Sequence, residues 1–371
     1  MSYAIFLIKP YNHKNTCTIL GEKLKTNSIY FISIKELSTF RSDIYYNYLK
    51  NNYENLTFVK IDQKNLIQSF NKLRALSNRY DIFIVMSPSH YLVPFARFFL
   101  GKNTYLDAGW SLFEGSVIAR RNFGFLGHNV AKAYLIDFVA ASLAKKIFLV
   151  SINQKKFYSK LFFIRLNKCE VIYTGVDEKK FRSNSDRNYF PDLYGNSQIV
   201  LFRGKYTVEA GIDILAAATI ALESKGITFW VLSPGLPRNI KFGKNTVVIR
   251  NFIRSQRRLV SAYKSASLTL GQLSNHTRLK RTIPHKAFES AYMSKPYLTA
   301  RSNGILEIFN EGTEVLCFNP SDTIDLENKI LDFFNDPGKF AYIGNNMRKK
   351  YDIKLNQAYL SSQLLKVVRQ N

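Results

Sequence analysis

The sequence predicts an α/β protein built from two doubly wound, Rossmann-like units in series. Short apolar runs alternate with longer amphipathic runs, and this alternation predicts parallel sheets with helices on both faces. The alternation stops at a polar, turn-rich stretch and then restarts, and 371 residues suit two domains better than one. We expect domains at 1–175 and 198–354, a linker at 176–197, and a last helix at 355–371 that returns to the first domain.

The first unit supplies strand-like and helix-like runs in turn. The expected strands are Tyr3–Ile8, Ser28–Ile34, Leu56–Ile61, Asp81–Met86, Thr104–Asp107, Lys146–Val150 and Glu170–Tyr173. The expected helices include Asn65–Arg79, Tyr91–Leu100, Ile118–Lys145 and Gln154–Phe163. Because Tyr3–Ile8 has no basic leader, it indicates a buried first strand rather than a signal peptide.

The second unit repeats the pattern. Its expected strands are Gln198–Arg203, Ile227–Ser233, Thr246–Arg250, Ser267–Leu270, Pro296–Ala300 and Glu314–Phe318. Its expected helices are Glu209–Ser224, Ser255–Ser265, Pro284–Met293, Ile305–Asn310, Asp325–Asn335 and Lys339–Lys350, and Asn356–Val368 closes the chain. In such sheets ligands bind beyond the carboxyl ends of the strands, so the two units predict a cleft and a site between them.

The net charge is the unusual feature of the composition. Lys and Arg number 53 and Asp and Glu 27, which gives +26, and the excess divides as +14 over residues 1–180 and +12 over the remainder. A polyanionic partner is therefore expected: nucleotide phosphates, acidic lipid or nucleic acid. Compositional drift is the plain alternative. The odd number of cysteines, three in all and far apart, favours a reduced cytosolic protein without a metal site.

Three loops of the second unit indicate where an anion would bind. Gly204 and Lys205 follow a strand and precede a helix, a place where backbone amides and a cation can meet a phosphate. Lys286 and Glu289 share one helix face, and the carboxylate could accept two ribose hydroxyls while the lysine meets a phosphate. The amides of Ser302, Asn303 and Gly304 could also bind an anion. An ordinary turn, a surface ion pair and plain helix capping are the respective alternatives.

Several segments in order resemble family 4 glycosyltransferases of the GT-B fold. The segment VIYTGVDEKKF resembles the family's crossover between domains, and FRGKYTVEAGIDIL its donor-phosphate loop. IPHKAFESAYMSKPYLTARSNGILEIFNEG resembles the donor helix with the strand and loop that follow. NTYLDAGWSLFEGSVIARR and YLIDFVAASLAKKIFLVS resemble parts of the acceptor domain in one bacterial branch.

The resemblance implies that a sugar is transferred from a nucleotide-diphosphate sugar with retention of configuration and without a metal. The nucleotide sugar is a substrate, so no cofactor is expected. Lys205 matches the basic residue at the diphosphate, and Glu289 the carboxylate at the ribose. Two positions depart from the family pattern: Arg281 stands where a first glutamate is expected, and Ala210 where a lysine is expected before Gly211. Either Arg281 or Lys286 could supply the missing cation.

The first unit offers candidates for the acceptor side. His90 follows a strand end and could bond the acceptor or the donor sugar, and Asp107 or Glu114 could orient an acceptor hydroxyl. A locally held histidine and an Asx turn are the alternatives. With Lys205 and Arg281, His90 and Asp107 form the predicted catalytic set.

The stretch Gln154–Lys168 is basic and aromatic, as interfacial helices are. It predicts a membrane surface formed by Lys155, Lys156, Lys160 and Phe162, with an ordinary packed helix as the alternative. Arg120–Leu126 has a similar composition.

The sequence thus favours a cytoplasmic glycosyltransferase for bacterial surface polysaccharide, with a glycan or lipid-linked acceptor and peripheral contact with the inner face of an anionic membrane. The alternatives are a nucleotide-sugar epimerase, a non-catalytic binding subunit and, with less support, a nucleic-acid-binding protein, for which no recognition motif is found.

Overall fold

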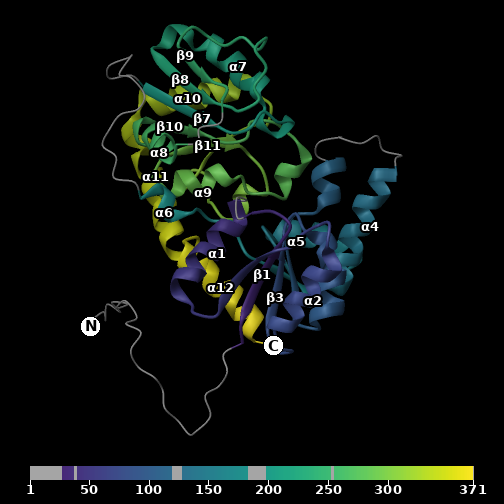
Figure 1. Cartoon of the computed structure of the whole chain (residues 1–371). Helices are drawn as coiled ribbons and strands as arrows, with labels where there is room; N and C mark the ends of the chain where they lie inside the picture. The colour runs from purple at the N-terminus through teal and green to yellow at the C-terminus, as the bar shows by residue number, and fades with distance from the viewer. Residues whose placement is uncertain (1–26, 37–39, 119–127, 183–197, 252–254, 371) are drawn as a thin grey trace, which may run out of the picture.

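The computed structural model describes residues 27–36, 40–118, 128–182, 198–251 and 255–370, which form two α/β domains (Figure 1). Each domain has a six-stranded parallel sheet. The predicted fold class is therefore confirmed. The expected strand Tyr3–Ile8, most of the linker, Cys17 and the basic segment Arg120–Leu126 lie outside the described residues.

The first sheet has the order β2-β1-β3-β4-β5-β6. Its strands are β1 (Ile29–Ser33), β2 (Leu56–Lys60), β3 (Ile82–Met86), β4 (Thr104–Gly109), β5 (Ile147–Leu149) and β6 (Cys169–Val171). Its helices are α1 (Phe40–Asn52), α2 (Leu66–Leu76), α3 (Val93–Leu100), α4 (His128–Leu143) and α5 (Ile152–Leu161), with short turns η1 (His90–Leu92), η2 (Glu114–Ile118) and η3 (Leu166–Lys168). Every residue of β3 is buried, as expected for a strand covered by helices on both faces.

The second sheet has the order β12-β11-β10-β7-β8-β9. Its strands are β7 (Gln198–Arg203), β8 (Ile227–Leu232), β9 (Thr246–Ile249), β10 (Leu268–Leu270), β11 (Tyr297–Ala300) and β12 (Leu316–Phe318). Its helices are α7 (Ile212–Ala221), α8 (Gln256–Ser265), α9 (His285–Tyr292), α10 (Thr323–Asn335) and α11 (Pro337–Lys354), with short turns η4 (Val208–Ala210), η5 (Glu223–Lys225), η6 (Thr277–Lys280) and η7 (Ile305–Glu307). The segment Ile305–Asn310, expected as a helix, contains only the short turn η7.

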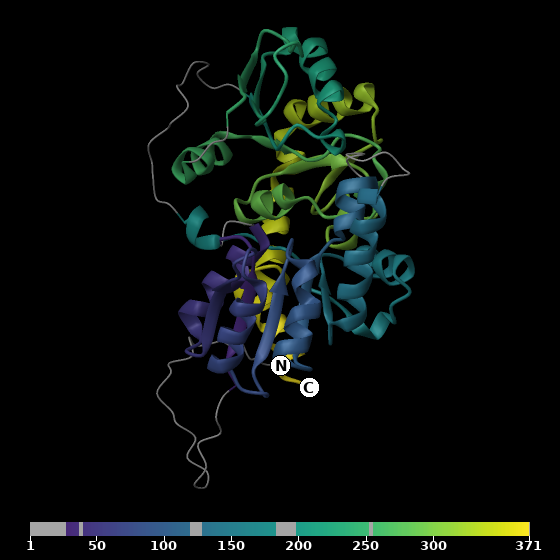
Figure 2. The same ribbon diagram turned by 45° about the vertical axis from the view of Figure 1, so that its right-hand side comes forward.

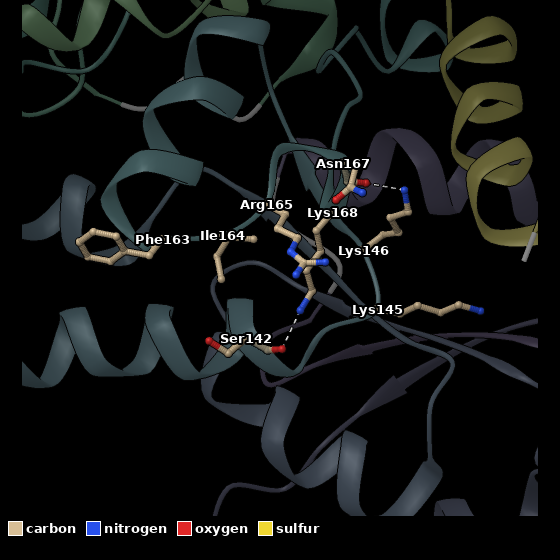
Figure 3. Close-up of a pocket in the computed structure, with 8 residues that line it drawn as sticks. All are labelled: Ser142, Lys145, Lys146, Phe163, Ile164, Arg165, Asn167 and Lys168. Atoms are coloured by element: carbon tan, nitrogen blue, oxygen red, sulfur yellow. Dashed lines mark hydrogen bonds between the residues drawn. The ribbon is translucent and has the colours of Figure 1, made fainter.

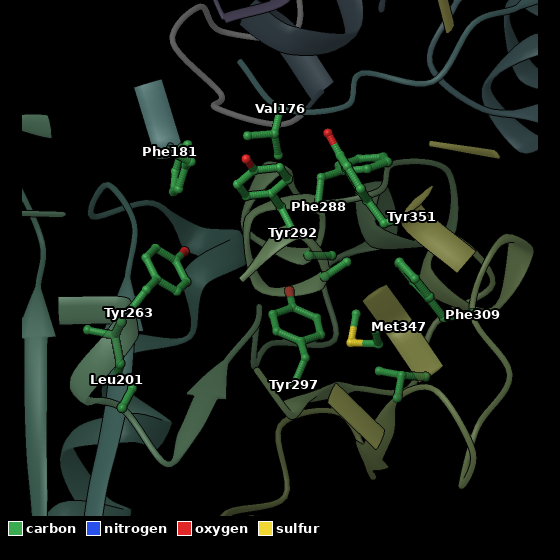
Figure 4. Packing of buried hydrophobic residues seen from close by; sticks show 14 of the residues in the cluster. Val176, Phe181, Leu201, Tyr263, Phe288, Tyr292, Tyr297, Phe309, Met347 and Tyr351 are labelled. Atoms are coloured by element: carbon green, nitrogen blue, oxygen red, sulfur yellow. The ribbon is translucent and has the colours of Figure 1, made fainter. Parts of the chain in front are cut away.

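The core of the second domain is rich in aromatic side chains. On one face of its sheet, Tyr263, Phe288, Tyr292 and Tyr297 pack between α8, α9 and the strands (Figure 4). Phe181 of the short helix α6 (Glu178–Phe181) packs edge-on against the Tyr263 ring. The crossover segment is therefore held by the same core that holds α9.

The chain crosses back to the first domain after α11. Helix α12 (Gln357–Arg369) lies along the first domain in both views (Figures 1 and 2) and packs against α1. Leu360, Leu364 and Leu365 join the core on that face of the first sheet. At the crossing, Gln357 N donates to Glu178 Oε1 at 2.9 Å, so the outgoing and returning segments are bonded to each other.

In the part of the chain that the structure describes, no helix combines the length and the apolar character needed to cross a bilayer.

Leu364→Ala should lower the free energy of unfolding by about 2–5 kcal/mol, because the side chain is fully buried between α12 and the first domain. Lys366→Ala on the exposed side of the same helix should change it by less than about 0.5 kcal/mol. Urea denaturation of both variants measures the difference. Equal stabilities would show that α12 does not stabilise the first domain.

Candidate functional site

The order in which the chain adds strands to the second sheet reverses between β7 and β10. From β7 the chain continues outward through β8 and β9, whereas β10 lies on its other side and leads to β11 and β12. At such a point the loops leave in opposite directions and open the place where α/β proteins bind ligands. Gly204 follows β7 and Gly271 follows β10, so both glycines lie at this edge.

Lys286 fills the space between these two glycines. Its Nζ donates to the carbonyl oxygen of Gly271 at 3.0 Å and lies 3.9 Å from the centre of the Phe202 ring. A β-carbon on Gly204 would lie 3.2 Å from the same nitrogen, so the absence of a side chain makes room for the lysine. Burial lowers the pKa of Lys286, and the nearby Arg203 adds to this effect. Lys286, which was predicted to meet a phosphate, thus lies between β7 and β10, but its side chain is buried.

The loop from Gly204 to Gly211 crosses this edge. Lys205 is exposed, which leaves its ammonium available to a ligand. Gly211 has a φ of 64° and a β-carbon there would lie 2.8 Å from Ser274 N, so only glycine fits where α7 begins. Ala210 is buried in the core, and a lysine at this position would have to leave that core. Position 210 therefore provides no cation at this edge.

Arg278 in η6 is the cation beside this loop. Its Nη1 lies 3.0 Å from Glu209 Oε1, and its guanidinium lies over the ring of Trp110 from the first domain, 5.3 Å from the centre. Its Nε is buried and, among the described residues, has no hydrogen-bond partner. Sequence reasoning missed Arg278. Residues 251–300 hold nine basic side chains, and only the tertiary structure shows which of them lies beside the loop.

Glu289 forms the centre of a buried polar network. Its Oε1 forms an ion pair with Arg203 Nη1 at 3.0 Å and lies 3.0 Å from His285 Nδ1, and its Oε2 accepts from the Tyr263 hydroxyl at 2.6 Å. Burial acts to raise the pKa of Glu289, but Arg203, His285 and Tyr263 outweigh it and hold the pKa at about 2. Glu289 is 1% exposed, and its predicted binding of a ribose stays a prediction.

Arg281 connects the two domains. Its Nη2 and Nε donate to Glu114 Oε1 at 2.8 and 3.0 Å, and its guanidinium lies 3.9 Å from the centre of the Phe157 ring. Glu114 is fully buried and also accepts from Gln154 Nε2 at 2.6 Å. The structure thus brings together Arg281, predicted as a catalytic cation, and Glu114, predicted to orient an acceptor hydroxyl. The catalytic role predicted for Arg281 stays a prediction.

A second contact across the domain boundary involves the loop after β11. Glu307 accepts from the backbone amides of Ile152 and Asn153 at 2.7 and 3.0 Å, so it caps the amino end of α5. The side chain of Asn153 also donates to the carbonyl oxygen of Asn303 at 3.2 Å. In the same loop, a β-carbon on Gly304 would lie 2.3 Å from Thr282 O, and Ser302 Oγ accepts from Ile305 N at 3.4 Å. Anion binding by residues 302–304 stays a prediction.

His90 and Asp107 are buried in the first domain. Asp107 accepts from Arg41 Nε at 2.6 Å, and His90 Nε2 lies 3.9 Å from Asp137 Oδ1. Burial lowers the pKa of His90 to about 4 and raises that of Asp137 to about 7. Near neutral pH the histidine is therefore uncharged. The predicted contacts of His90 and Asp107 with substrate remain untested.

The predicted membrane surface needs a correction. Helix α5 ends at Leu161, and Phe162 turns into the core of the first domain, where it is fully buried. The prediction that Phe162 faces a membrane is therefore wrong, because a 3.6-residue period was continued past the end of the helix. Lys156 and Lys160 are exposed and Lys155 is partly so.

Comparisons with known proteins agree with this architecture. Residues 214–359 match a family model described as glycosyl transferase-like. HepE from Anabaena, solved with UDP, has a TM-score of 0.70 at 14% identity over 93% of this chain and 100% of that one. The chain has the GT-B fold of glycosyltransferases. Sucrose-phosphate synthase from Thermosynechococcus elongatus has a TM-score of 0.69 at 14% identity, covering 93% of this chain and 99% of that one.

Starch synthase IV from Arabidopsis thaliana, solved with ADP and acarbose, has a TM-score of 0.66 at 10% identity over 93% of this GT-B chain and 99% of that one. Among curated proteins no match is found.

The low pKa of Glu289 makes its contribution to stability depend on pH. Its pKa is about 2 in the folded protein against an ordinary 4.5, so the stabilisation is complete above pH 4.5 and is lost as the pH falls toward 2. The difference in free energy of unfolding between the wild type and Glu289→Gln should therefore shrink over this range. Urea denaturation at a series of pH values measures it.

Glu54→Gln is the control, because Glu54 is exposed in the first domain. Its effect should be small at every pH. A difference for Glu289→Gln that is constant from pH 6 to pH 3 would contradict the charged, paired state of this carboxylate.

Proposed function

We propose that this protein is a retaining glycosyltransferase that moves a sugar from a nucleoside-diphosphate sugar to a glycan or lipid-linked acceptor in bacterial surface polysaccharide synthesis, without a metal. The observation that carries the proposal is the cationic edge between β7 and β10. There the loop Gly204–Gly211, Lys205, Arg278 and Lys286 surround the place where a parallel sheet of this topology binds ligands.

The comparisons support a nucleotide donor. HepE was solved with UDP and with UDP-glucose, and starch synthase IV with ADP. In this chain the fold is the same, and the cations at the carboxyl end of β7 suit a diphosphate. The net charge of +26 is consistent with attraction of an anionic donor from solution.

The chemistry makes one main demand on the protein. When the bond between the sugar and the phosphate breaks, the departing nucleoside diphosphate gains negative charge. The acceptor oxygen bonds to the same face of the anomeric carbon, and its proton passes to an oxygen of the departing diphosphate. Preorganised cations stabilise that charge, which is usually the largest catalytic contribution. We assign this role to Lys205, which is exposed, and to Arg278, whose Nε is buried and, in the described part of the chain, unpartnered.

Arg281 is proposed to act differently. Its guanidinium is bound to Glu114 and covered by Phe157, so it sets how the first domain meets the donor domain. A glutamate at this position would place two carboxylates together across the junction, and the arginine avoids that repulsion.

A panel of nucleoside diphosphates tests the proposal, with thermal stabilisation as the measure of binding, followed by donor turnover with and without an acceptor. Transfer only with an acceptor supports the glycosyltransferase. Turnover of the donor without an acceptor indicates an epimerase, binding without turnover a non-catalytic subunit, and no nucleotide binding contradicts the proposal.

Arg278→Ala should weaken binding of the preferred nucleoside diphosphate by at least about tenfold, because a charge-assisted contact to the diphosphate is lost. Binding of the corresponding nucleoside should not change. Isothermal titration calorimetry measures both affinities. Arg278→Lys keeps the charge and should retain more of the diphosphate affinity than the alanine variant.

The control for this series is Arg257→Ala, an exposed arginine in α8. It removes the same charge from the same domain and should leave the affinity unchanged. If Arg257→Ala and Arg278→Ala weaken the diphosphate equally, the effect is one of net charge, and Arg278 has no place at the site.

A further inference from the structure

A pocket of about 470 Å³ lies in the first domain, away from the site described above. Lys145 and Lys146 line it just before β5 begins, and Lys168 lines it just before β6 begins. The pocket is therefore at the amino-terminal edge of the first sheet. The contacts to the second domain are made at the opposite edge, by Trp110, Glu114 and residues 151–153.

The lining of this pocket is strongly basic. Four of its residues are cationic: Lys145, Lys146, Arg165 and Lys168. Lys146 is paired with Glu170 at 2.8 Å, and Lys145 Nζ donates to Asn103 Oδ1 at 3.0 Å. Lys168 Nζ instead donates to the carbonyl oxygen of Ser142 at 2.6 Å, and in Figure 3 the Arg165 side chain extends in the same direction. Burial lowers the pKa of Lys168, and the charge of Arg97 acts in the same sense. An anion in this pocket would relieve the excess of positive charge.

The rim of the pocket is apolar and exposed. Phe163 is 85% exposed and points away from the other lining residues in Figure 3. Its φ of 53° is in the left-handed region, which is unfavourable for an aromatic residue. Leu166, three residues on, is 50% exposed. The turn after α5 thus buries Phe162 and presents Phe163 to solvent.

We propose that this pocket binds the phosphate of an anionic lipid headgroup, and that Phe163 and Leu166 enter the membrane interface beside it. A free anion would need the cations but not the exposed aromatic ring, whereas a bilayer surface offers a phosphate and an apolar layer together. The cations together with the exposed aromatic ring therefore favour a membrane surface over a free anion. The inference goes beyond the proposed function and does not depend on sugar transfer.

The pocket lies on the far side of the first domain from the junction of the two domains. A protein held at the amino-terminal edge of its first sheet keeps the opposite edge, and with it the junction of the two domains, directed away from the pocket. The surface proposed here also differs from the lysines of α5 predicted from the sequence, because it uses residues 145–146 and 163–168.

Co-sedimentation with vesicles tests the proposal, using phosphatidylcholine alone and phosphatidylcholine mixed with phosphatidylglycerol. The double variant Arg165→Gln/Lys168→Gln should weaken binding to the mixed vesicles by at least about tenfold, given the contribution of each cation near an anionic surface. Phe163→Ser should also weaken it several-fold. Because Phe163 is exposed, this variant keeps the packing of the core.

Two charge-matched controls accompany these variants. Lys225→Gln/Lys241→Gln removes two exposed cations from the second domain, and Lys156→Gln/Lys160→Gln removes two from α5. Both should change binding less than threefold. An equal loss in all three double variants would overturn the proposal, because attraction would then follow net charge alone.

A soluble probe separates the two sources of phosphate. If glycerol phosphate binds the wild type and Arg165→Gln/Lys168→Gln abolishes it, while mixed vesicles are not bound, the membrane assignment is overturned. If the wild type binds neither the mixed vesicles nor glycerol phosphate, the membrane assignment is overturned as well. Nucleoside diphosphate affinity, measured in the same variants, should be unchanged, so failure here is distinct from failure of the proposed transferase.

Discussion

The buried carboxylate of Glu114 fixes how the two halves of this protein meet. It is fully buried and accepts bonds from Arg281 of the second domain and Gln154 of its own. A carboxylate without these partners would be costly to bury, so the first domain requires the arginine that the second domain supplies. Trp110, which precedes Glu114 in the chain, contacts Arg278, and the amino end of α5 contacts Glu307. The carboxyl edges of both sheets are brought together by this set of contacts.

The same junction involves one of the two cations considered for the loop Gly204–Gly211. The sequence left open whether Arg281 or Lys286 replaces the lysine absent at position 210. In the structure Arg281 is committed to Glu114, and Lys286 is buried under Gly204 with its nitrogen on Gly271 O. Arg278 is the arginine next to the loop. It is likewise paired, with Glu209, but its Nε has no hydrogen-bond partner among the described residues.

Two surfaces of the first domain have different chemistry. Its carboxyl edge is polar and is matched by residues of the second domain, while its amino edge combines several cations with exposed apolar side chains. The first arrangement suits a junction around a soluble donor, and the second suits a lipid surface.

The sequence by itself determined the two parallel sheets, the restart of the pattern near residue 198 and the loops that follow strand ends, because hydrophobic periodicity and glycine positions are local signals. Only the tertiary structure decided which charged side chains are buried and paired and which are exposed. Asp107 and Glu289 look alike as acids near strand or helix ends, yet both are buried and paired with arginines distant in sequence. Phe162 and Phe163 are adjacent, and the end of α5 sends one into the core and the other into solvent. Burial and pairing arise from contacts between distant segments, which no local pattern records.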